Sequence, residues 1–318
     1  MSVLRIGTRG SALALWQTNR VCEALARRGR ATEIIEISTT GDIHAEASIG
    51  QLADPALFTR QLDEAMLASR IDLAVHSLKD LPTQLPEGIL IAAVSAREDA
   101  RDALVTRGGK FADIPEGGTI ATSSLRRRAQ LLRARPDLVI TEIRGNVGTR
   151  LSKLEQNAGW SATVLAAAGL IRLGLEERIS ERLSYDLMLP APGQAAMAVT
   201  ARFDDISSID AVRRAVHEER SALCVQVERA MLHELEGGCE VPVAALAVFE
   251  DAKGWSMRCR ARVASLDGRQ VAEADTIRLV RTGEDADTFG QELAVELRDK
   301  GAGRILDELG LAAGRGRP

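Results

Sequence analysis

The first part of the chain alternates short apolar runs with segments in which apolar residues recur at helical spacing. Strands are predicted at residues 3–8, 31–38 and 71–76, and helices that begin at Ser11 and near residue 59 separate them. Strands joined by helical segments of this length are typical of a parallel sheet with helices on its faces. This part of the sequence therefore predicts an α/β lobe.

The same order of elements returns between residues 119 and 166. Strands are predicted at 119–122, 138–143 and 161–166, and the helix after the first of them begins at Ser123-Ser124 and ends at Pro136. In both stretches a hydroxyl residue begins the first helix, and a G-D or G-N turn follows the second strand. We interpret this as a repeat of architecture rather than of sequence. Two similar lobes are expected, with a ligand between them at the carboxyl ends of the strands.

The last third of the chain has a different pattern. A helix is predicted at residues 218–235, followed by three strand candidates at 243–249, 255–265 and 270–280 and by a final helix. The short turns between these strands favour an antiparallel sheet with helices on one side. This region is therefore predicted to be a separate domain of the α+β type.

Composition narrows the function classes. The 318 residues, 45% hydrophobic and 27% charged, are typical of a globular chain of two or three domains. A net charge of −4 and an aromatic content of 3% argue against a general nucleic-acid binder. No apolar stretch reaches the roughly 18 residues that a membrane helix needs, and Arg5 and Arg9 interrupt the first apolar segment, unlike a secretory signal. We expect a cytoplasmic protein with neither a membrane nor a nucleic-acid partner.

Arginine dominates the basic residues, because only five of the 41 are lysines. A GC-rich genome explains this bias without any function, and recognition of carboxylate or phosphate is the functional alternative. In the sequence TSSLRRR, Arg126, Arg127 and Arg128 fall in the first turn of a predicted helix, where each opposes the helix dipole by about 0.3–1 kcal/mol. Such a turn attracts anions, so an acidic ligand explains the arginines, and a solvated basic face is the alternative.

Two further loops carry charged residues after predicted strands. Lys79 and Asp80 follow the buried strand at 71–76, where open α/β sheets place their ligands. Asp80 is suited to hold a donor N–H or a cationic reaction centre, and a solvated ion pair is the alternative. In the sequence RGNVGTR, Arg144 and Arg150 enclose two glycines that allow close approach of a phosphate or carboxylate, although many such loops are only turns.

Cys239 differs from the other cysteines. Cys22, Cys224 and Cys259 lie in apolar stripes of predicted helices or strands, and no C-x-x-C pair or close histidine favours a metal site. Cys239 instead follows two glycines in a loop. An accessible thiol there is a candidate nucleophile or attachment point, and an inert loop cysteine is the alternative.

Five motifs occur in the order found in the porphobilinogen deaminases, also called hydroxymethylbilane synthases, and the chain resembles this family nearly end to end. They are RGSALALWQ from Arg9, AVHSLKDLP from Ala74, TSSLRRR from Thr122, RGNVGTRLSKL from Arg144 and EGGCEVP from Glu236. The resemblance implies two periplasmic-binding-protein-like α/β lobes and a C-terminal α+β domain with a three-stranded antiparallel sheet. The first lobe is expected at residues 1–96 and 196–216, the second at 97–195 and the C-terminal domain at 217–318.

The resemblance also implies an activity. Members of the family condense four porphobilinogen molecules head to tail, with loss of ammonia, into the linear tetrapyrrole hydroxymethylbilane, a step of haem-type tetrapyrrole biosynthesis. They build it on a covalent dipyrromethane cofactor, whose thioether cysteine corresponds to Cys239, and their catalytic carboxylate corresponds to Asp80. The expected cofactor- and substrate-binding residues are Arg9, Ser11, Lys79, Thr122, Ser123, Ser124, Arg126, Arg127, Arg144, Gly145, Arg150 and Arg172. No metal is implied, and we expect a monomer that acts on a small molecule.

Two segments depart from the family pattern. Residues 53–58 read ADPALF where the family usually has Gly-Gly-Lys-Gly-Leu-Phe, in the flexible cover of its cleft. Ala195 stands where the family usually has glycine, at the hinge-like return between the lobes. Because an altered cover affects closure, a two-lobed anion-binding protein that kept the fold and lost turnover stays open as the alternative to the enzyme.

Overall fold

The computed structural model of the chain describes residues 3–38, 59–235 and 241–309, which form two compact units. The first unit contains the chain up to Glu98 together with Ala195–Ala222, and the second contains Asp99–Gln194 and the chain from Leu223 onward. The C-terminal sheet and its helices thus group with the second lobe. The division into three domains stays a prediction.

The sheet of the first lobe is mixed. Within the described residues its strand order is β2-β1-β3-β10-β4, where β1 is Leu4–Thr8, β2 is Thr32–Glu36, β3 is Leu73–Ser77, β4 is Ile89–Val94 and β10 is Met197–Arg202. Strands β2, β1 and β3 run parallel, as predicted, and β10 is antiparallel to both of its neighbours.

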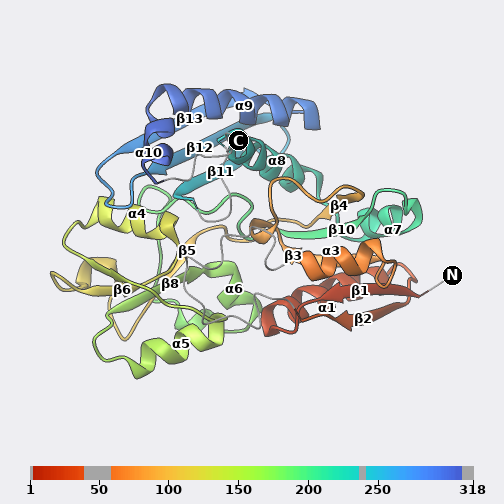
Figure 1. Cartoon of the computed structure of the whole chain (residues 1–318), viewed down its shortest axis with the longest axis horizontal. Coiled ribbons are helices and arrows are strands. Elements are labelled where there is room, and N and C mark those ends of the chain that lie inside the picture. Colours follow the sequence, from red (N-terminus) through yellow and green to blue (C-terminus); the bar gives the residue numbers. More distant parts are fainter. Residues whose placement is uncertain (1–2, 39–58, 236–240, 310–318) are drawn as a thin grey trace, which may run out of the picture. The chain divides into compact units, whose positions relative to one another are not determined.

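Helices cover both faces of this sheet (Figure 1). Helices α1 (Ala12–Ala26) and α7 (Ile206–Val216) pack on one face, and α3 (Arg60–Leu67) packs on the other. Alternate residues of β3 point to opposite faces, so Val75 belongs to the α1–α7 core and Ala74 to the α3 core. Covered on both faces, β3 is a nearly continuous apolar run, and its carboxyl end leads to the short helix η2 (Leu78–Asp80).

The second lobe repeats the arrangement of the first. The strand order in the described residues is β7-β6-β8-β5-β9, where β5 is Asp102–Thr106, β6 is Thr119–Ala121, β7 is Val139–Thr141, β8 is Ala162–Ala166 and β9 is Glu181–Arg182. Again three strands are parallel and the fourth, β5, is antiparallel to both of its neighbours. The predicted repeat of architecture is confirmed.

The antiparallel strands differ from the expected parallel sheets. Strand β5 enters the second lobe directly after the chain leaves the first, and β10 enters the first lobe directly after the chain returns. Neither strand follows a crossover helix within its own sheet, and such a helix is what makes successive strands parallel. Strands β4, β5 and β10 had no place in the predicted pattern.

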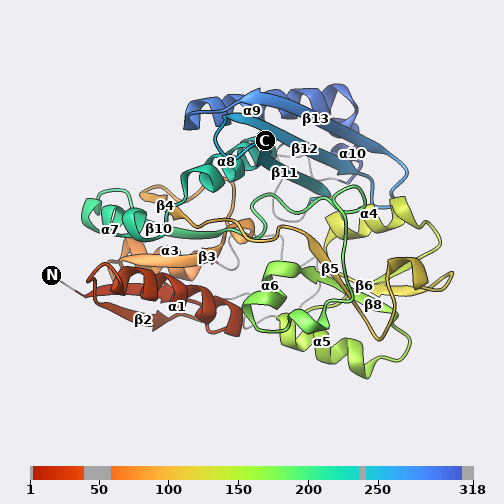
Figure 2. The same ribbon diagram turned by 180° about the vertical axis from the view of Figure 1, so that it is seen from behind.

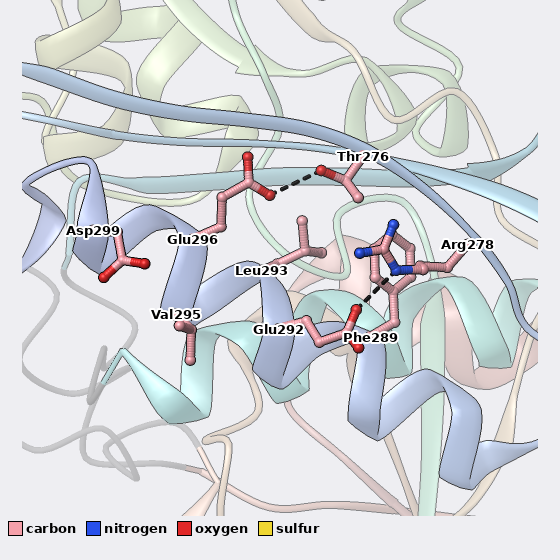
Figure 3. A pocket seen from close by; sticks show the side chains of 8 residues that line it. All are labelled: Thr276, Arg278, Phe289, Glu292, Leu293, Val295, Glu296 and Asp299. Carbon is pink, nitrogen blue, oxygen red and sulfur yellow. Dashed lines mark hydrogen bonds and ion pairs between the residues drawn. The ribbon is translucent and has the colours of Figure 1, made fainter.

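Helices also enclose the second sheet, as Figure 2 shows from behind. Helix α4 (Leu125–Ala134) packs on one face, and α5 (Val147–Gln156) and α6 (Ala167–Arg172) pack on the other. Two short 3-10 helices, η3 (Phe111–Asp113) and η4 (Glu176–Arg178), lie in the connections. The first turns of α4 and α5 carry the two arginine-rich motifs.

The C-terminal region has the predicted antiparallel sheet of β11 (Val243–Phe249), β12 (Ser256–Ala264) and β13 (Val271–Leu279). Its apolar face packs against three helices, which are α8 (Glu219–Glu234), α9 (Gly283–Asp299) and α10 (Ala302–Glu308). Cys259 lies in this core, as its place in an apolar stripe of a predicted strand indicated. The sequence pattern therefore identified both the sheet and the side on which the helices lie.

The segment that returns to the first unit contains an unusual backbone conformation. Gly193 and Ala195 both have positive φ values, +75° and +73°, and Ala195 is buried. An alanine side chain rarely adopts this conformation, because its Cβ crowds the following carbonyl oxygen. The other departure from the family pattern, residues 53–58, lies outside the described residues. No helix in the described ranges is long and apolar enough to cross a membrane.

Candidate active site

The first unit places a charged pair at the carboxyl end of its buried central strand. Strand β3 ends at Ser77, and Lys79 and Asp80 follow in η2 with half-buried side chains. Leu78 fixes this turn, because it is buried and its backbone N–H donates to the Ala196 carbonyl at 3.0 Å. The turn therefore presents Asp80 where an α/β sheet offers a ligand site.

The start of α1 contributes to the same end of the sheet. The Ser11 hydroxyl caps α1 by accepting from the Ala14 N–H at 3.3 Å. Gln17, one turn further on, is almost fully buried and its amide donates to the Ser77 hydroxyl at 2.9 Å. This contact ties the RGSALALWQ motif to the end of β3.

His76, in the last part of β3, is neutral, and the Arg9 charge contributes to this. Burial, and secondarily the Arg9 charge, lower the pKa of His76 to about 4, so the imidazole is neutral at pH 7. Its Nε2 lies 3.2 Å from the Thr200 hydroxyl, which agrees with the structural role expected for a histidine that ends a buried strand. The neutral His76 imidazole therefore adds no positive charge to this end of the sheet.

In the second unit, the TSSLRRR motif forms the start of α4. The Ser124 hydroxyl caps the helix by accepting from the Arg127 N–H at 3.4 Å, and the Thr122 hydroxyl accepts from the Ser124 N–H at 3.2 Å. The Ser123 hydroxyl instead donates to the Ile143 carbonyl at 2.8 Å. These three hydroxyl groups order the loop on which the arginines depend.

Arg126 and Arg127, here called the arginine pair, share one buried acid. Arg126 Nη1 lies 2.6 Å from Asp102 Oδ2, and Arg127 Nη2 lies 2.8 Å from Asp102 Oδ1. The side chains of the pair are only 5% and 6% exposed, whereas Arg128 is exposed to solvent. Asp102 thus offsets part of the positive charge that opposes the α4 dipole. The sequence analysis had explained the tolerance of this charge by an acidic ligand alone.

The RGNVGTR motif forms the start of α5. Gly145 has a φ of +112°, and a Cβ there would lie 2.6 Å from Thr149 Cγ2, so this position requires glycine. The Asn146 side chain caps the helix by accepting from the Thr149 N–H at 2.9 Å. The glycine therefore serves a tight loop that leads directly into a helix start.

Basic side chains surround this loop. Arg150 Nε donates to the Gly145 carbonyl at 2.8 Å, and Lys153 Nζ donates to the Arg144 carbonyl at 3.2 Å. Arg144 Nε is buried and has no hydrogen-bond partner among the described residues. Arg172, at the end of α6, is also buried. A guanidinium N–H that is buried and unpaired is suited to an acidic ligand.

The predicted site residues thus fall into two groups, one in each compact unit. The group of the first unit consists of Arg9, Ser11, Lys79 and Asp80, and that of the second consists of Thr122, Ser123, Ser124, Arg126, Arg127, Arg144, Gly145, Arg150 and Arg172. Cys239 lies outside the described residues. In the described part of the chain, no cluster of three or more histidine, cysteine, aspartate or glutamate side chains is arranged to hold a metal ion.

Two polar residues near the second group were missed as partners. Asp102 is fully buried and lies between the arginine pair and the Gln194 amide, which donates to its Oδ1 at 3.2 Å. Asp102 begins a strand that the apolar pattern had not identified. The only feature of the sequence that could have indicated the role of Asp102 is its place immediately before the apolar run ALV.

Two α/β lobes that carry a carboxylate at one strand end and arginine-rich helix starts are typical of proteins that bind acidic small molecules. Residues 4–210 match the family model "Porphobilinogen deaminase, dipyromethane cofactor binding domain", and residues 222–299 match its C-terminal domain. The chain belongs to the porphobilinogen deaminase family. The transferase function predicted from the motifs, condensation of porphobilinogen on a dipyrromethane cofactor, is the function of this family.

Curated relatives agree over nearly the whole length of the chain. The porphobilinogen deaminase of Desulforudis audaxviator is 46% identical over 304 residues, which cover 95% of this chain and 96% of the relative. That of Rubrobacter xylanophilus is 47% identical over 304 residues, with the same coverage. That of Geobacter metallireducens is 44% identical over 308 residues, covering 96% and 94%. Among solved structures, the methionine-binding protein MetQ aligns with 67% of this chain and 89% of its own at 12% identity and a TM-score of 0.44.

Proposed function

We propose that this chain condenses four porphobilinogen molecules into hydroxymethylbilane, with Asp80 as the catalytic carboxylate and Cys239 as the cofactor attachment point. The observation that carries the proposal is the sheltered positive charge of the second lobe, where two guanidinium groups share one carboxylate. Each pyrrole of substrate and product bears an acetate and a propionate. A growing chain therefore accumulates carboxylates that fixed cations must hold.

The residues of the second lobe fit a dipyrromethane group. The arginine pair carries one positive charge that Asp102 does not balance, and Arg144 Nε has no hydrogen-bond partner in the described part of the chain. These guanidinium groups together offer donors for several carboxylates. Bound there, the group would supply the primer onto which substrate pyrroles are added. Arg126, Arg127, Arg144, Arg150 and Arg172 would hold its acidic side chains, with Thr122, Ser123, Ser124 and Gly145 shaping the loops around them.

Asp80 is assigned to the reacting pyrrole. The C–N bond of the protonated aminomethyl group of porphobilinogen breaks, its electron pair leaves with the nitrogen as ammonia, and a cationic methylene-pyrrole remains. A carboxylate that accepts the pyrrole N–H stabilises this cation, and such electrostatic stabilisation commonly supplies the largest part of catalysis. The bound pyrrole chain would supply the free α-carbon to which the new C–C bond forms, and this carbon would lose its proton. Arg9, Ser11 and Lys79 would bind the acidic groups of the incoming substrate.

Purified protein supplied with porphobilinogen tests the proposal directly. Four molecules of ammonia should appear for each molecule of hydroxymethylbilane, and the intact protein should carry a two-pyrrole excess mass. Binding of porphobilinogen without ammonia release would identify the two-lobed binding protein instead. We also propose the three-domain division, a cytoplasmic location and a monomeric state, and gel filtration with light scattering measures the last of these.

A further inference from the structure

The carboxylate of Asp102 is the common partner of three side chains. Its Oδ2 accepts from Arg126 Nη1 at 2.6 Å, and its Oδ1 accepts from Arg127 Nε and Nη2 at 3.0 and 2.8 Å. The Gln194 amide donates to the same Oδ1 at 3.2 Å. Because one carboxylate holds both guanidinium groups, its position and charge determine the arrangement of both.

Backbone carbonyls hold each member of the arginine pair on a second side. Arg126 Nη1 also donates to the Leu189 carbonyl at 2.6 Å, and Arg127 Nη1 donates to the Val164 carbonyl at 2.8 Å. A planar guanidinium that is fixed by a carboxylate and a carbonyl has little freedom to rotate. The pair is therefore ordered before any ligand arrives, provided that Asp102 keeps its charge.

The charges of this cluster do not balance. Two guanidinium groups face one carboxylate, and among the described residues no second acidic side chain forms an ion pair with Arg126 or Arg127. One positive charge thus remains in a region sheltered from water, where charges interact strongly and an unpaired charge is unfavourable. An acidic ligand removes the imbalance.

We propose that Asp102 is a positioning residue of the anion site. It holds the arginine pair in one arrangement and cancels one of its two charges, and the remaining charge meets a carboxylate of the cofactor or of the growing pyrrole chain. This inference rests on the proposed function. Because Asp102 is fully buried, its effect on these groups is transmitted through the arginine pair.

Gln194 is a second, weaker positioning residue, and it connects the cluster to the C-terminal region. The preceding residue, Gly193, donates its backbone N–H at 2.7 Å to the buried carboxylate of Glu228 on α8. In the sequence, α8 leads directly to residues 236–240, which include Cys239. Buried hydrogen bonds therefore link the helix before the attachment cysteine with the carboxylate that orients the arginines.

The Asp102→Asn variant separates positioning from simple attraction. The amide has nearly the same size as the carboxylate, but it raises the local charge by one and places an N–H group against a guanidinium. If Asp102 positions the pair, fewer molecules should carry the two-pyrrole adduct. For each molecule that carries it, KM for porphobilinogen should rise about tenfold while kcat stays within about threefold. A lower KM would mean that charge alone governs the site, and this result would overturn the inference.

Thr163→Val is the matched control for a purely structural effect. The buried Thr163 hydroxyl donates to the Ala121 carbonyl at 2.8 Å in the same sheet, and among the described residues it forms no hydrogen bond with Asp102, Arg126 or Arg127. This variant should lose thermal stability and keep both the adduct and the wild-type KM. If Asp102→Asn behaves in the same way, with an unchanged KM for each loaded molecule, Asp102 is only a stabilising residue.

A third variant covers the case in which Asp102→Asn does not fold. Gln194→Met removes one donor to Asp102 Oδ1 and keeps the side-chain length, so KM should rise about two- to fivefold at constant kcat. An unchanged KM in this variant would also contradict the inference. Failure of the proposed function would look different, because the wild-type protein itself would then lack the adduct and release no ammonia.

Discussion

The Ser123 hydroxyl donates to the Ile143 carbonyl at 2.8 Å and lies 3.2 Å from the Ile143 backbone nitrogen, which donates back to it. Ser123 precedes the first turn of α4, and Ile143 immediately precedes Arg144. This reciprocal contact therefore joins the two arginine-rich loops of the second lobe. The TSSLRRR and RGNVGTR motifs, about twenty residues apart in the sequence, thus lie side by side and form one surface.

Arg144 is the member of this surface whose role can be isolated most cleanly. Its buried Nε has no protein partner in the described ranges, so Arg144→Ala should cost binding and little stability. A sheltered charge-assisted contact contributes about 1.5–3 kcal/mol, which is a loss of roughly 10- to 150-fold in the affected step. Mass analysis of trapped one-, two- and three-pyrrole adducts should show where elongation stalls.

The exposed Arg128 provides the control for Arg144. Arg128→Ala removes the same side chain from the neighbouring motif, and it should leave the adduct ladder unchanged. A normal ladder and normal turnover in Arg144→Ala would show that this arginine does not hold the pyrrole chain.

Cys239 is predicted to carry the dipyrromethane. Cys239→Ser should show the unmodified polypeptide mass, because a serine hydroxyl is a far weaker nucleophile than a thiolate. Intact-protein mass spectrometry distinguishes the two forms directly. Cys22→Ser, which changes a half-buried cysteine on α1, should retain the two-pyrrole excess. Active wild-type protein with no excess mass would refute the assignment.

Asp80 is predicted to act on the reaction and not on the fold. Asp80→Asn keeps the shape of the side chain but removes the negative charge that faces the cationic intermediate, so kcat should fall by about 100-fold or more. The melting temperature should change little, since Asp80 is half-buried and ends the short 3-10 helix η2. A kcat near the wild-type value would show that another group stabilises the cation.

Local chemistry explains which parts of the site the sequence revealed. Ser124 was expected to begin a helix and caps α4, because helix caps depend on neighbours only three residues away. Asp102 and Gln194 were not recognised, because their contacts join residues 24 and 92 positions apart. Hydrophobic periodicity contains no information about such pairings. It also could not assign β5 and β10, whose partners are set by the path of the chain between the lobes.

Ala195 is predicted to carry backbone strain. At a φ of +73° an alanine costs about 1–2 kcal/mol relative to glycine, and the greater freedom of glycine in the unfolded chain offsets about 0.4–1 kcal/mol. Ala195→Gly should therefore raise the free energy of unfolding by roughly 0.5–1 kcal/mol. Urea denaturation measures this. Ala196→Gly, at a neighbouring buried alanine without positive φ, should destabilise the protein. Equal effects of the two changes would argue against strain at residue 195.

Asp63 gives the chain a pH dependence that does not involve the active site. The side chain is 3% exposed on α3, and neither carboxylate oxygen has a hydrogen-bond partner in the described structure. Burial raises the pKa of Asp63 to about 6, a shift that the nearby Thr59 hydroxyl partly opposes. In the unfolded chain the pKa of an aspartate is about 3.9, so between these values the folded state binds more protons. Stability must therefore fall as the pH rises from about 4 to 6.

Asp63→Asn should remove this dependence. The neutral amide avoids the cost of a buried charge, so the variant should exceed the wild type in free energy of unfolding at pH 7.5, by at most about 3 kcal/mol. The difference should shrink to nearly nothing at pH 4, where the wild-type carboxyl is protonated in the folded state. Urea denaturation at several pH values measures both curves. Glu64→Gln, at the exposed neighbouring position, should shift the wild-type curve only slightly, because the Glu64 charge is the smallest of the three influences on the pKa of Asp63. An Asp63→Asn difference that stays constant between pH 4 and 7.5 would show that the effect comes from packing and not from ionisation.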